Sequence, residues 1–413
     1  MKKKIILCIA DGLGDRPCEE LGGKTPLEFA NTKNLDKIAM NGTTGIMDLY
    51  QAGTPVGTDL GHMILFGYGI EDYPGRGPIE AFGNNLELIS GDVAFRCNFA
   101  TVDDKLNVKD RRAGRIREGT AELAQALNGM EVRGVKVFFK EATEHRAVMV
   151  LRGKNLSSEV ADTDPKIEGK KIYKCVGTDN SKEADFTADV VNEIIMKANR
   201  ILKEHHLNRE REERGLKPAN AILTRGAGIM PHIEKITEKL GFKASCIAAE
   251  HTVVGAARLA GFEVVTDKSF TGNIDTDIYK KAEKALESIE NNDFTVLHFK
   301  ATDLMGHDNN PKGKAKAAEL YDKMVGLVIE GIEKNIDEQV IIALAADHST
   351  PCERREHSGE PVPIAICGNG IRRDNTIFYD EIECSRGGLG RIKGNDFNRI
   401  LLDYLEVTIK RGN

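Results

Sequence analysis

The sequence contains no apolar run long enough to cross a membrane. A transmembrane helix needs roughly 18 or more apolar residues in succession, and no stretch of the chain approaches that length. The N-terminus, MKKKIILCIAD, starts like a signal peptide, with lysines before apolar residues. Its apolar run, Ile5 to Ala10, is shorter than the roughly 7–15 residues of a signal sequence, and Asp11 ends it. We therefore expect no membrane partner.

The cysteines and the charges exclude further classes of protein. The eight cysteines are scattered, and no pair has the CxxC spacing. In a chain of 413 residues they indicate buried thiols in a reducing compartment, so we expect a cytoplasmic protein. Lys and Arg number 58 against 64 Asp and Glu, which gives a net charge of −6. A mildly acidic chain is a poor candidate for a general nucleic-acid binder.

Continuous apolar segments predict strands that are buried on both faces. They are Lys4–Ala10, Thr295–Lys300, Val340–Ala345 and the shorter Pro363–Cys367. Helical spacing of apolar residues lies between them, in Ile278–Ile289 and Lys314–Ile332, and Asp275 or Thr276 could cap the first of these helices. Strands that alternate with helices predict βαβ units and a parallel sheet.

The middle of the chain has a different pattern. Alternating segments such as Asp92–Thr101 and Arg146–Leu151 are followed by a long amphipathic helix that includes Val191 and Leu202. The charged run Glu204–Pro218 is most simply a solvated helix end. We expect 88–230 to be an α+β domain inserted into an α/β domain formed by 1–87 and 231–413.

Three of the predicted strands are followed by side chains that bind metals. These are Asp11 after the first strand, Asp303 and His307 after TVLHFK, and Asp347, His348 and His357 after VIIALA. Ligands of open α/β sheets bind outside the carboxyl ends of the strands, so we expect these side chains to converge. Mixed carboxylates and imidazoles suit Mn²⁺ or Zn²⁺ better than Ca²⁺ or Mg²⁺. Six ligands match two ions, which roughly 4 Å apart can hold the attacking and leaving oxygens of a phosphoryl group.

Each aspartate taken singly has a structural alternative as a helix cap or turn residue. The joint pattern, with three ligand-bearing segments after three buried strands, favours the metal site.

The segment GTPVGTDLGHM contains a candidate nucleophile. Thr58 lies near the start of a predicted helix, where a metal and the helix dipole would both favour an alkoxide. The alternative is that Thr58 or Asp59 only caps this helix. His62, four residues further on, is more simply a packing or capping histidine.

Arginines are concentrated in DRRAGRIR, which spans Asp110–Arg117. Guanidinium groups suit phosphate and carboxylate ligands, although a solvated surface explains such a run equally well. Arg225, in LTRGAG, follows another apolar strand and precedes glycines, which could place it in a cleft.

Taken together, these motifs resemble a known family. The segments ADGLGDRP, GTPVGTD, GYGIEDYPGRGPIEA, LTRGAG, TDLMGHD and DHSTPCERREHSGEPVPI resemble those of the archaeal-type 2,3-bisphosphoglycerate-independent phosphoglycerate mutases, which belong to the alkaline phosphatase superfamily. The resemblance extends nearly end to end and includes GGLGRIKG near the C-terminus. It implies an alkaline-phosphatase-like parallel-sheet core with an inserted α+β transferase-like domain that binds substrate.

The resemblance also implies roles for individual residues. Asp303, His307 and His357 would bind one divalent ion, and Asp11, Asp347 and His348 would bind the other, with Thr58 beside it as nucleophile and further ligand. Asp110, Arg111, Arg115 and Arg225 would bind the substrate. The ions would be Mn²⁺, with Zn²⁺ or Co²⁺ as alternatives, and no 2,3-bisphosphoglycerate would be needed.

The implied activity is the interconversion of 3-phosphoglycerate and 2-phosphoglycerate through a phosphothreonine. The chain departs from the family at two positions, with Thr58 in place of the usual Ser and Val254 in place of the usual Lys. The alternative is therefore a related phosphomutase or phosphate-ester hydrolase that acts on another small phosphorylated substrate. The oligomeric state is open.

Overall fold

The computed structural model describes residues 3–336 and 339–412. The chain divides into two compact units. One, here called the discontinuous unit, is formed by the residues up to Tyr73 and those from Glu234 onward; the other, the inserted unit, is Pro74–Ile233. The sequence predicted that the inserted domain begins at residue 88. Helix α4 (Arg76–Gly83) nevertheless lies in the inserted unit, because its Ala81 is buried with residues such as Ala94 and Val150.

A mostly parallel sheet forms the centre of the discontinuous unit. Among the described residues its strand order is β10-β9-β11-β1-β12-β13-β2-β14. The strands are β1 (Lys3–Ala10), β2 (Gly42–Asp48), β9 (Ala244–Ile247), β10 (Glu263–Val265), β11 (Phe294–Phe299), β12 (Gln339–Ala345), β13 (Val362–Cys367) and β14 (Gly390–Lys393). The expected parallel arrangement is confirmed for β1, which pairs in parallel with β11 on one side and β12 on the other.

Strand β13 is the exception to the parallel arrangement, because it runs antiparallel to both β12 and β2. A parallel pair requires a crossover connection, usually a helix, to return the chain to the same edge. Residues 346–361, which connect β12 to β13, contain no helix. The chain therefore turns back where β12 ends, and β13 lies beside β12 in the opposite direction.

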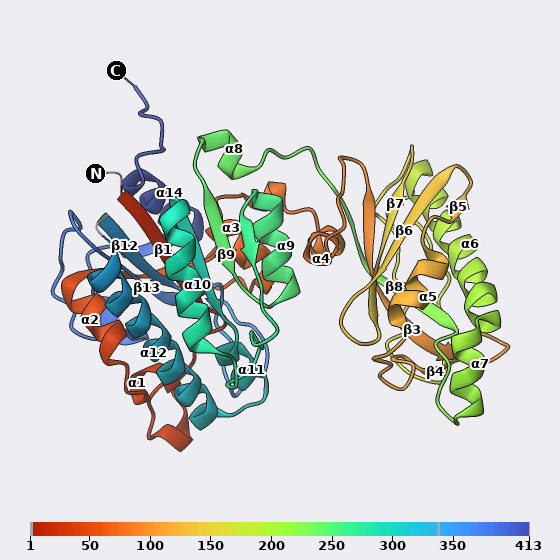
Figure 1. Ribbon diagram of the computed structural model, residues 1–413, viewed down its shortest axis with the longest axis horizontal. Helices are drawn as coiled ribbons and strands as arrows, with labels where there is room; N and C mark the ends of the chain where they lie inside the picture. Colours follow the sequence, from red (N-terminus) through yellow and green to blue (C-terminus); the bar gives the residue numbers. More distant parts are fainter. Residues whose placement is uncertain (1–2, 337–338, 413) are drawn as a thin grey trace. The chain divides into compact units, whose positions relative to one another are not determined.

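Helices cover both faces of this sheet (Figure 1). The helices of the unit are α1 (Pro26–Phe29), α2 (Lys33–Asn41), α3 (Thr58–Leu65), α8 (Ile236–Leu240), α9 (His251–Ala260), α10 (Ile278–Asn291), α11 (Ala301–His307), α12 (Pro311–Asn335), α13 (Glu381–Cys384) and α14 (Gly394–Tyr404). Helix α12 packs against α10 and α2, and α3 packs against α9 and α14. The apolar stripe predicted for α10 is buried, but the helix is capped by Asp277, which accepts from Lys280 N, and not by Asp275 or Thr276.

The inserted unit is an antiparallel sheet with α5 (Thr120–Leu127) and α6 (Lys182–Glu204) packed on one face and α4 on the other. Its strands are β3 (Val93–Val102), β4 (Val108–Asp110), β5 (Glu131–Val132), β6 (Val135–Glu141), β7 (Arg146–Arg152) and β8 (Ala221–Ile229), and helix α7 (His206–Glu213) follows α6. Alternate residues of β3, among them Phe95, Cys97 and Phe99, are buried in the core that includes Val191 and Leu202 of α6. Their neighbours Arg96 and Asn98 therefore lie on the other face of the sheet.

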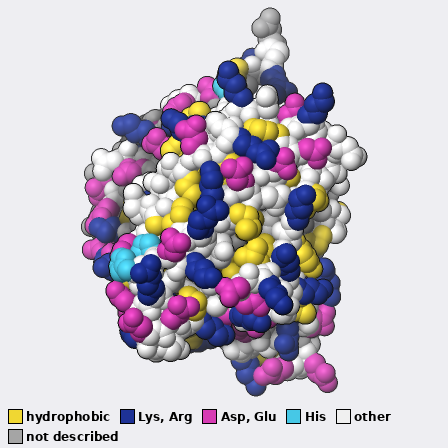
Figure 2. Space-filling view, turned by 90° about the vertical axis from the view of Figure 1, so that its right-hand side faces the viewer, with side chains coloured by type: hydrophobic (Ala, Val, Ile, Leu, Met, Phe, Trp, Pro, Cys, Tyr) yellow, Lys and Arg dark blue, Asp and Glu magenta, His cyan; other side chains and the backbone are white. Residues whose placement is uncertain are grey.

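The charged run after α6 forms α7 and ends in an exposed turn. Figure 2 shows acidic and basic side chains interspersed, with apolar ones between them, on the surface that it presents. None of the helices within the described residues has the length and the apolar character required to span a membrane.

Candidate active site

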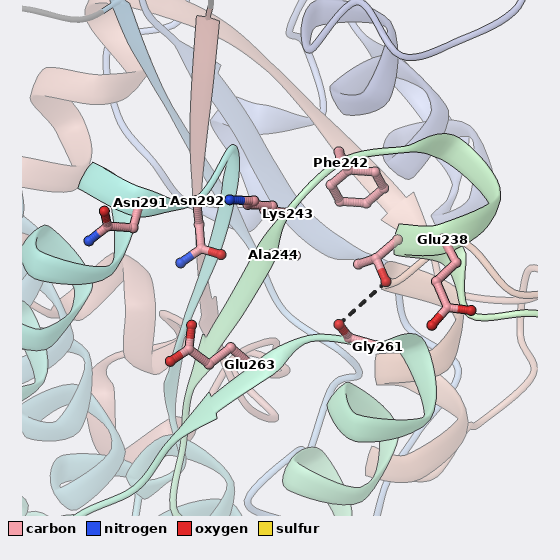
Figure 3. Close-up of a pocket in the computed structure, with 9 residues that line it drawn as sticks. Glu238, Phe242, Lys243, Ala244, Gly261, Glu263, Asn291 and Asn292 are labelled. Atoms are coloured by element: carbon pink, nitrogen blue, oxygen red, sulfur yellow. Dashed lines mark hydrogen bonds between the residues drawn. The ribbon is translucent and has the colours of Figure 1, made fainter.

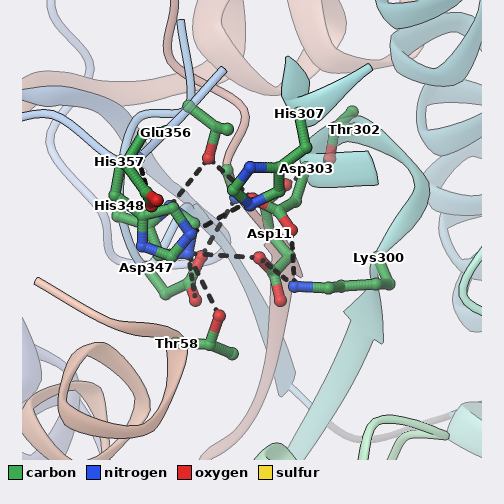
Figure 4. Close-up of polar contacts among 12 residues, drawn as sticks. Asp11, Thr58, Lys300, Thr302, Asp303, His307, Asp347, His348, Glu356 and His357 are labelled. Carbon is green, nitrogen blue, oxygen red and sulfur yellow. Dashed lines mark hydrogen bonds and ion pairs between the residues drawn. The ribbon is translucent and has the colours of Figure 1, made fainter. Parts of the chain in front are cut away.

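Three neighbouring strands bring the predicted metal ligands together. Because β11, β1 and β12 are adjacent and parallel, their carboxyl ends share one edge of the sheet. Asp11 follows β1, Asp303 lies in α11 directly after β11, and Asp347 follows β12. Figure 4 shows these side chains converging with three histidines, His307, His348 and His357.

The two predicted sets of ligands lie close together, but the structure groups their atoms differently in part. Asp303 lies with His348 and His357, and His307 lies with His357 and Glu356, which the sequence did not reveal. In Asp11, Asp347 and His348, three buried residues, the ligand atoms all lie within 4.8 Å of one another. Around Asp303, the Nε2 atom of His307 lies 3.4 Å and that of His357 lies 3.5 Å from Oδ1. His348 also stacks on His357, with ring centroids 3.6 Å apart, so the two groups are contiguous.

The histidines are oriented for metal binding by their other ring nitrogen. His357 Nδ1 lies 2.8 Å from the carbonyl of Val56, and His307 Nδ1 lies 2.9 Å from the carbonyl of Arg355. A carbonyl only accepts, so each Nδ1 carries a hydrogen and each Nε2 faces Asp303. Although burial lowers the pKa of His357, its hydrogen bonds with Asp303 and the carbonyl of Val56 raise it to about 8, so a metal would bind Nε2 in place of a proton. Once that proton is lost, the remaining Nδ1–H tautomer is the one that a metal ligand requires.

Thr58 lies beside the first group. It is the first residue of α3, after the N-cap Gly57, so its hydroxyl is not in the capping position. Its Oγ1 lies 3.2 Å from His348 Nε2. Helix α3 lies so close to the segment after β12 that a Cβ on Gly61 would be 2.5 Å from the carbonyl oxygen of Asp347, which explains a glycine there.

Lysine 300 is a site residue that the sequence patterns did not reveal. Its Nζ lies 3.0 Å from Asp11 Oδ1 and 2.7 Å from Asp303 Oδ2, between the two ligand groups (Figure 4). Burial alone would raise the pKa of Asp11, but Lys300 and hydrogen bonds with His298 and His348 lower it well below its usual value. These carboxylates are therefore anionic despite their burial. The only signal in the sequence was the charged residue that ends TVLHFK.

Two further histidines lie behind the ligands. His62 is fully buried, and its Nδ1 lies 2.8 Å from the carbonyl oxygen of Thr58 and 3.2 Å from Asp347 Oδ2. His298 Nε2 lies 3.0 Å from Asp11 Oδ2. His62 therefore packs in the core, as the simpler interpretation held, and also contacts a candidate ligand. His298, inside TVLHFK, looked like an ordinary strand residue in the sequence.

The predicted substrate-binding residues do not form one cluster in the inserted unit, although Arg111 and its partner Asp164 lie near enough to Arg225 to act on its pKa. Arg111 forms a bidentate ion pair with Asp164, with distances of 2.9 and 2.6 Å. Asp110 accepts from Lys217 Nζ at 2.7 Å. Arg115 is exposed in a turn with a φ of 56°. The run of arginines in the sequence is thus not one cluster in space.

Arg225 lies instead among arginines from other strands. It pairs across the sheet with Arg96 on β3, and Arg146 on β7 lies opposite Asn98 on the same face. Burial and the charges of Arg111, Arg146 and Arg76 lower the pKa of Arg225, although Asp164 opposes them. Among the described residues, no acceptor lies within hydrogen-bond distance of its buried Nε. Arg96 and Arg146 were not identified from the sequence, because a shared sheet face depends on strand register. Arg76, at the start of α4, was not identified either.

Two other features of the structure do not belong to this site. Glu122, His205 and His206 form a further group of potential ligands, in the inserted unit. His205 Nδ1, however, accepts the amide hydrogen of Leu207 at the start of α7, which leaves the proton on Nε2, where a metal would have to bind.

A surface pocket of about 470 Å³ lies at the opposite edge of the large sheet (Figure 3). It is lined by Lys243, Ala244, Glu263 and Asn292, among others, at the amino ends of β9, β10 and β11. None of the candidate ligands lines it.

The chain is similar along its whole length to archaeal proteins of one name. It is 45% identical to the 2,3-bisphosphoglycerate-independent phosphoglycerate mutase of Thermococcus kodakarensis over 414 residues, which cover 100% of this chain and 99% of that protein. It is 46% identical to the protein of the same name from Pyrococcus abyssi, with 100% of both chains covered. The chain belongs to the 2,3-bisphosphoglycerate-independent phosphoglycerate mutase family. The resemblance of its motifs to that family is thereby confirmed.

Family descriptions and solved structures agree with this membership. Residues 39–208 match the phosphoglycerate mutase family of that name, and residues 173–358 match "Type I phosphodiesterase / nucleotide pyrophosphatase". A structure from Pyrococcus horikoshii covers 100% of both chains with a TM-score of 0.85 and 38% identity. The cofactor-independent phosphoglycerate mutase of Thermoplasma acidophilum has a TM-score of 0.74 and 34% identity, over 98% of this chain and 100% of its own. The alkaline-phosphatase-like α/β fold expected from the motifs is confirmed.

Proposed function

We propose that this phosphoglycerate mutase family member interconverts 3-phosphoglycerate and 2-phosphoglycerate without 2,3-bisphosphoglycerate, through a phosphothreonine at Thr58. The observation that carries the proposal is the position of the Thr58 hydroxyl, 3.2 Å from His348 Nε2 and at the first residue of α3. A hydroxyl there lies beside a metal-ligand group and at the positive end of a helix dipole.

The donor atoms suit two divalent ions. Asp303, His307 and His357 would hold one, and Asp11, Asp347 and His348 the other, beside Thr58. Three buried carboxylates outnumber the single charge of Lys300, and the histidine Nε2 atoms, once deprotonated, would complete the sets. Mixed oxygen and nitrogen donors favour Mn²⁺, with Zn²⁺ or Co²⁺ as alternatives. When bound, such ions neutralise charge on a transferring phosphoryl group and favour ionisation of a nearby hydroxyl.

The reaction follows as two phosphoryl transfers. In the first, the Thr58 hydroxyl gives up its proton as a bond forms between Oγ1 and phosphorus, the ester bond to the substrate breaks, and the released alkoxide takes up a proton. In the second, the other hydroxyl of glycerate loses its proton and attacks the phosphothreonine, the bond between phosphorus and Thr58 Oγ1 breaks, and Oγ1 takes up a proton to restore the hydroxyl. Both transfers develop charge on the same oxygens, so one set of charged groups stabilises both.

Arginines of the inserted unit are our candidates for binding the phosphate and carboxylate of the substrate. Arg225 is the strongest, since its buried Nε lacks an acceptor among the described residues and other arginines surround it. Arg111 and Arg115 are included from the family motif. Asp110 would act by ordering the turn that contains them, because its Oδ1 accepts from Arg112 N at 2.7 Å.

The test is an assay of the purified protein with 3-phosphoglycerate, added Mn²⁺ and no 2,3-bisphosphoglycerate. We expect 2-phosphoglycerate to form with little release of inorganic phosphate. Phosphate release without isomerisation would replace the mutase by a phosphate-ester hydrolase, the alternative that Thr58 in place of the family's serine raises. Activity only on other phosphorylated compounds would indicate a related phosphomutase.

A further inference from the structure

Helix α12 contributes a fully buried lysine close to the candidate site. Lys314 lies in the first turns of the helix, and its side chain has no exposed surface. Its Nζ donates to three acceptors: the carbonyl of Gly14 at 3.0 Å, Asp15 Oδ2 at 2.8 Å and the carbonyl of Thr350 at 2.9 Å. Three acceptors satisfy all three protons of an ammonium group.

This position is unfavourable for a lysine on two counts. A charge buried with its partner loses its hydration, and a hydrophobic pair of similar size is often as stable. The amino-terminal end of a helix also carries partial positive charge, which disfavours a cation. Stability alone therefore does not account for Lys314, and the groups that it joins must be considered.

Lys314 and Asp15 connect the two segments that carry ligands for the second ion. Asp15 belongs to ADGLGDRP, the motif that contains Asp11, and its carboxylate accepts from Cys352 N at 3.2 Å. Gly14 O, one acceptor of Lys314, also accepts from Thr350 N at 3.1 Å. The segments after β1 and after β12 are thus held together around one ammonium group.

The spacing of these segments sets the geometry of the ligands. Gly12 N donates to Asp347 Oδ1 at 3.1 Å, across the two segments. Thr350 Oγ1 donates to Asp303 Oδ1 at 2.7 Å and lies 3.1 Å from His348 Nδ1, so it touches ligands of both groups. A displacement of the segment after β12 would therefore move several ligand atoms at once.

We propose that Lys314 and Asp15 are positioning residues of the metal site. They fix the spacing between the segment after β1, which carries Asp11, and the segment after β12, which carries Asp347 and His348. The inference rests on the proposed two-metal function and explains why ADGLGDRP contains a second aspartate. Neither residue contacts metal or substrate; both act through the backbone that they join.

The test compares Lys314→Met, Asp15→Asn and the double variant with the parent. Mn²⁺ affinity is measured by calorimetric titration, the geometry by the visible spectrum of the Co²⁺-loaded protein, and stability by thermal unfolding. The control is Lys316→Met on the same helix, an exposed lysine paired with Glu319 at 3.0 Å. Loss of groups that orient ligands typically weakens metal binding about 10- to 100-fold.

We expect this loss in both single variants and a changed Co²⁺ spectrum, with the control unaffected. The double variant separates positioning from charge balance. It leaves no buried unpaired charge, so its thermal stability should recover, but it cannot tie the two segments, so its Mn²⁺ affinity should stay low. If a single variant does not fold, the double variant decides.

Parental affinity and spectrum in the folded variants would overturn the inference, and so would joint recovery of stability and affinity in the double variant. Failure of the parent itself to bind Mn²⁺, Zn²⁺ or Co²⁺ would overturn the proposed function, and this inference with it.

Discussion

In the discontinuous unit, the charged side chains of the candidate site are buried and face groups of opposite sign, whereas in the inserted unit arginines gather beside one another on a sheet face. Asp11 and Asp347 have no exposed surface, and Lys300 lies between Asp11 and Asp303. In the inserted unit, burial and the charges of Arg76, Arg225 and Arg146 outweigh Glu80 and lower the pKa of Arg96 to about 10.

The difference separates two kinds of ligand. Buried carboxylates attract cations, and a set of crowded guanidinium groups attracts an anion. We infer that the first unit holds the metals and the nucleophile, while the second binds the anionic groups of the substrate. Changes in the discontinuous unit should therefore alter metal content, whereas changes in the inserted unit should alter kinetics and leave metal content unchanged.

Removal of metal should have the largest effect. Chelation should reduce isomerase activity to background, and Mn²⁺, Co²⁺ or Zn²⁺ should restore it. Hydrogen exchange should increase in residues 11–15 and 347–357, where ligands are held, and stay constant in β3 and β7. Full activity of a thoroughly stripped sample would contradict the two-metal proposal.

Replacement of a single metal ligand should cause the second-largest loss of activity. His357→Ala removes one imidazole of the Asp303 group, so metal content should fall from two ions to one by elemental analysis. Activity should fall by more than the roughly 100-fold typical of groups one step further from a metal. His307→Ala should behave alike. Two ions retained in both variants would show that other residues bind the metal.

Arg225→Ala should produce a smaller loss with a different signature. A lost hydrogen bond to a charged group costs about 1.5–3 kcal/mol, or about 10- to 150-fold in kcat/KM. Metal content should not change. Arg115→Ala, in an exposed turn, serves as the comparison and should cost less. Equal kinetics of Arg225→Ala and the parent would show that substrate contacts lie elsewhere.

The smallest expected effect concerns His145 in the inserted unit. Burial and the charges of Arg146, Arg112 and Arg225 lower its pKa to about 4, despite the opposing charge of Glu144. The unfolded chain binds this proton near pH 6.5. The stability contributed by neutral His145 is therefore complete above pH 6.5 and is lost as pH falls toward 4.

His145→Gln should remove part of this acid sensitivity. The difference in Tm loss between pH 6.5 and pH 4.5 should be about 2–4 °C, equivalent to about 1 kcal/mol. Thermal unfolding across that range checks it. Identical pH profiles of the variant and the parent would mean that neither burial nor the arginines lower the pKa of His145 in the folded protein.

The sequence predicted the ligand-bearing edge of the sheet well, for a topological reason. Parallel strands joined by helices bring their carboxyl ends to one edge, so residues after β1, β11 and β12 must converge. The reversal of β13 was missed because apolar strands look alike in either direction. Lys300 was missed because one terminal lysine carries no pattern.

The inserted unit was less predictable. In an antiparallel sheet, the residues that share a face depend on strand register, which distant segments determine. Arg96, Arg146 and Arg225 are therefore far apart in sequence but share a face, whereas neighbours in DRRAGRIR separate. The role of Asp15 likewise depends on Lys314, 299 residues away.

The most direct test of the central claim is detection of phosphate on Thr58. The parent protein, loaded with Mn²⁺, is incubated briefly with 3-phosphoglycerate, quenched in acid and digested for peptide mass spectrometry. The account predicts phosphothreonine at position 58, retained activity in Thr58→Ser and almost complete loss in a folded Thr58→Ala. Unmodified Thr58, together with most of the isomerase activity surviving in Thr58→Ala, would contradict it.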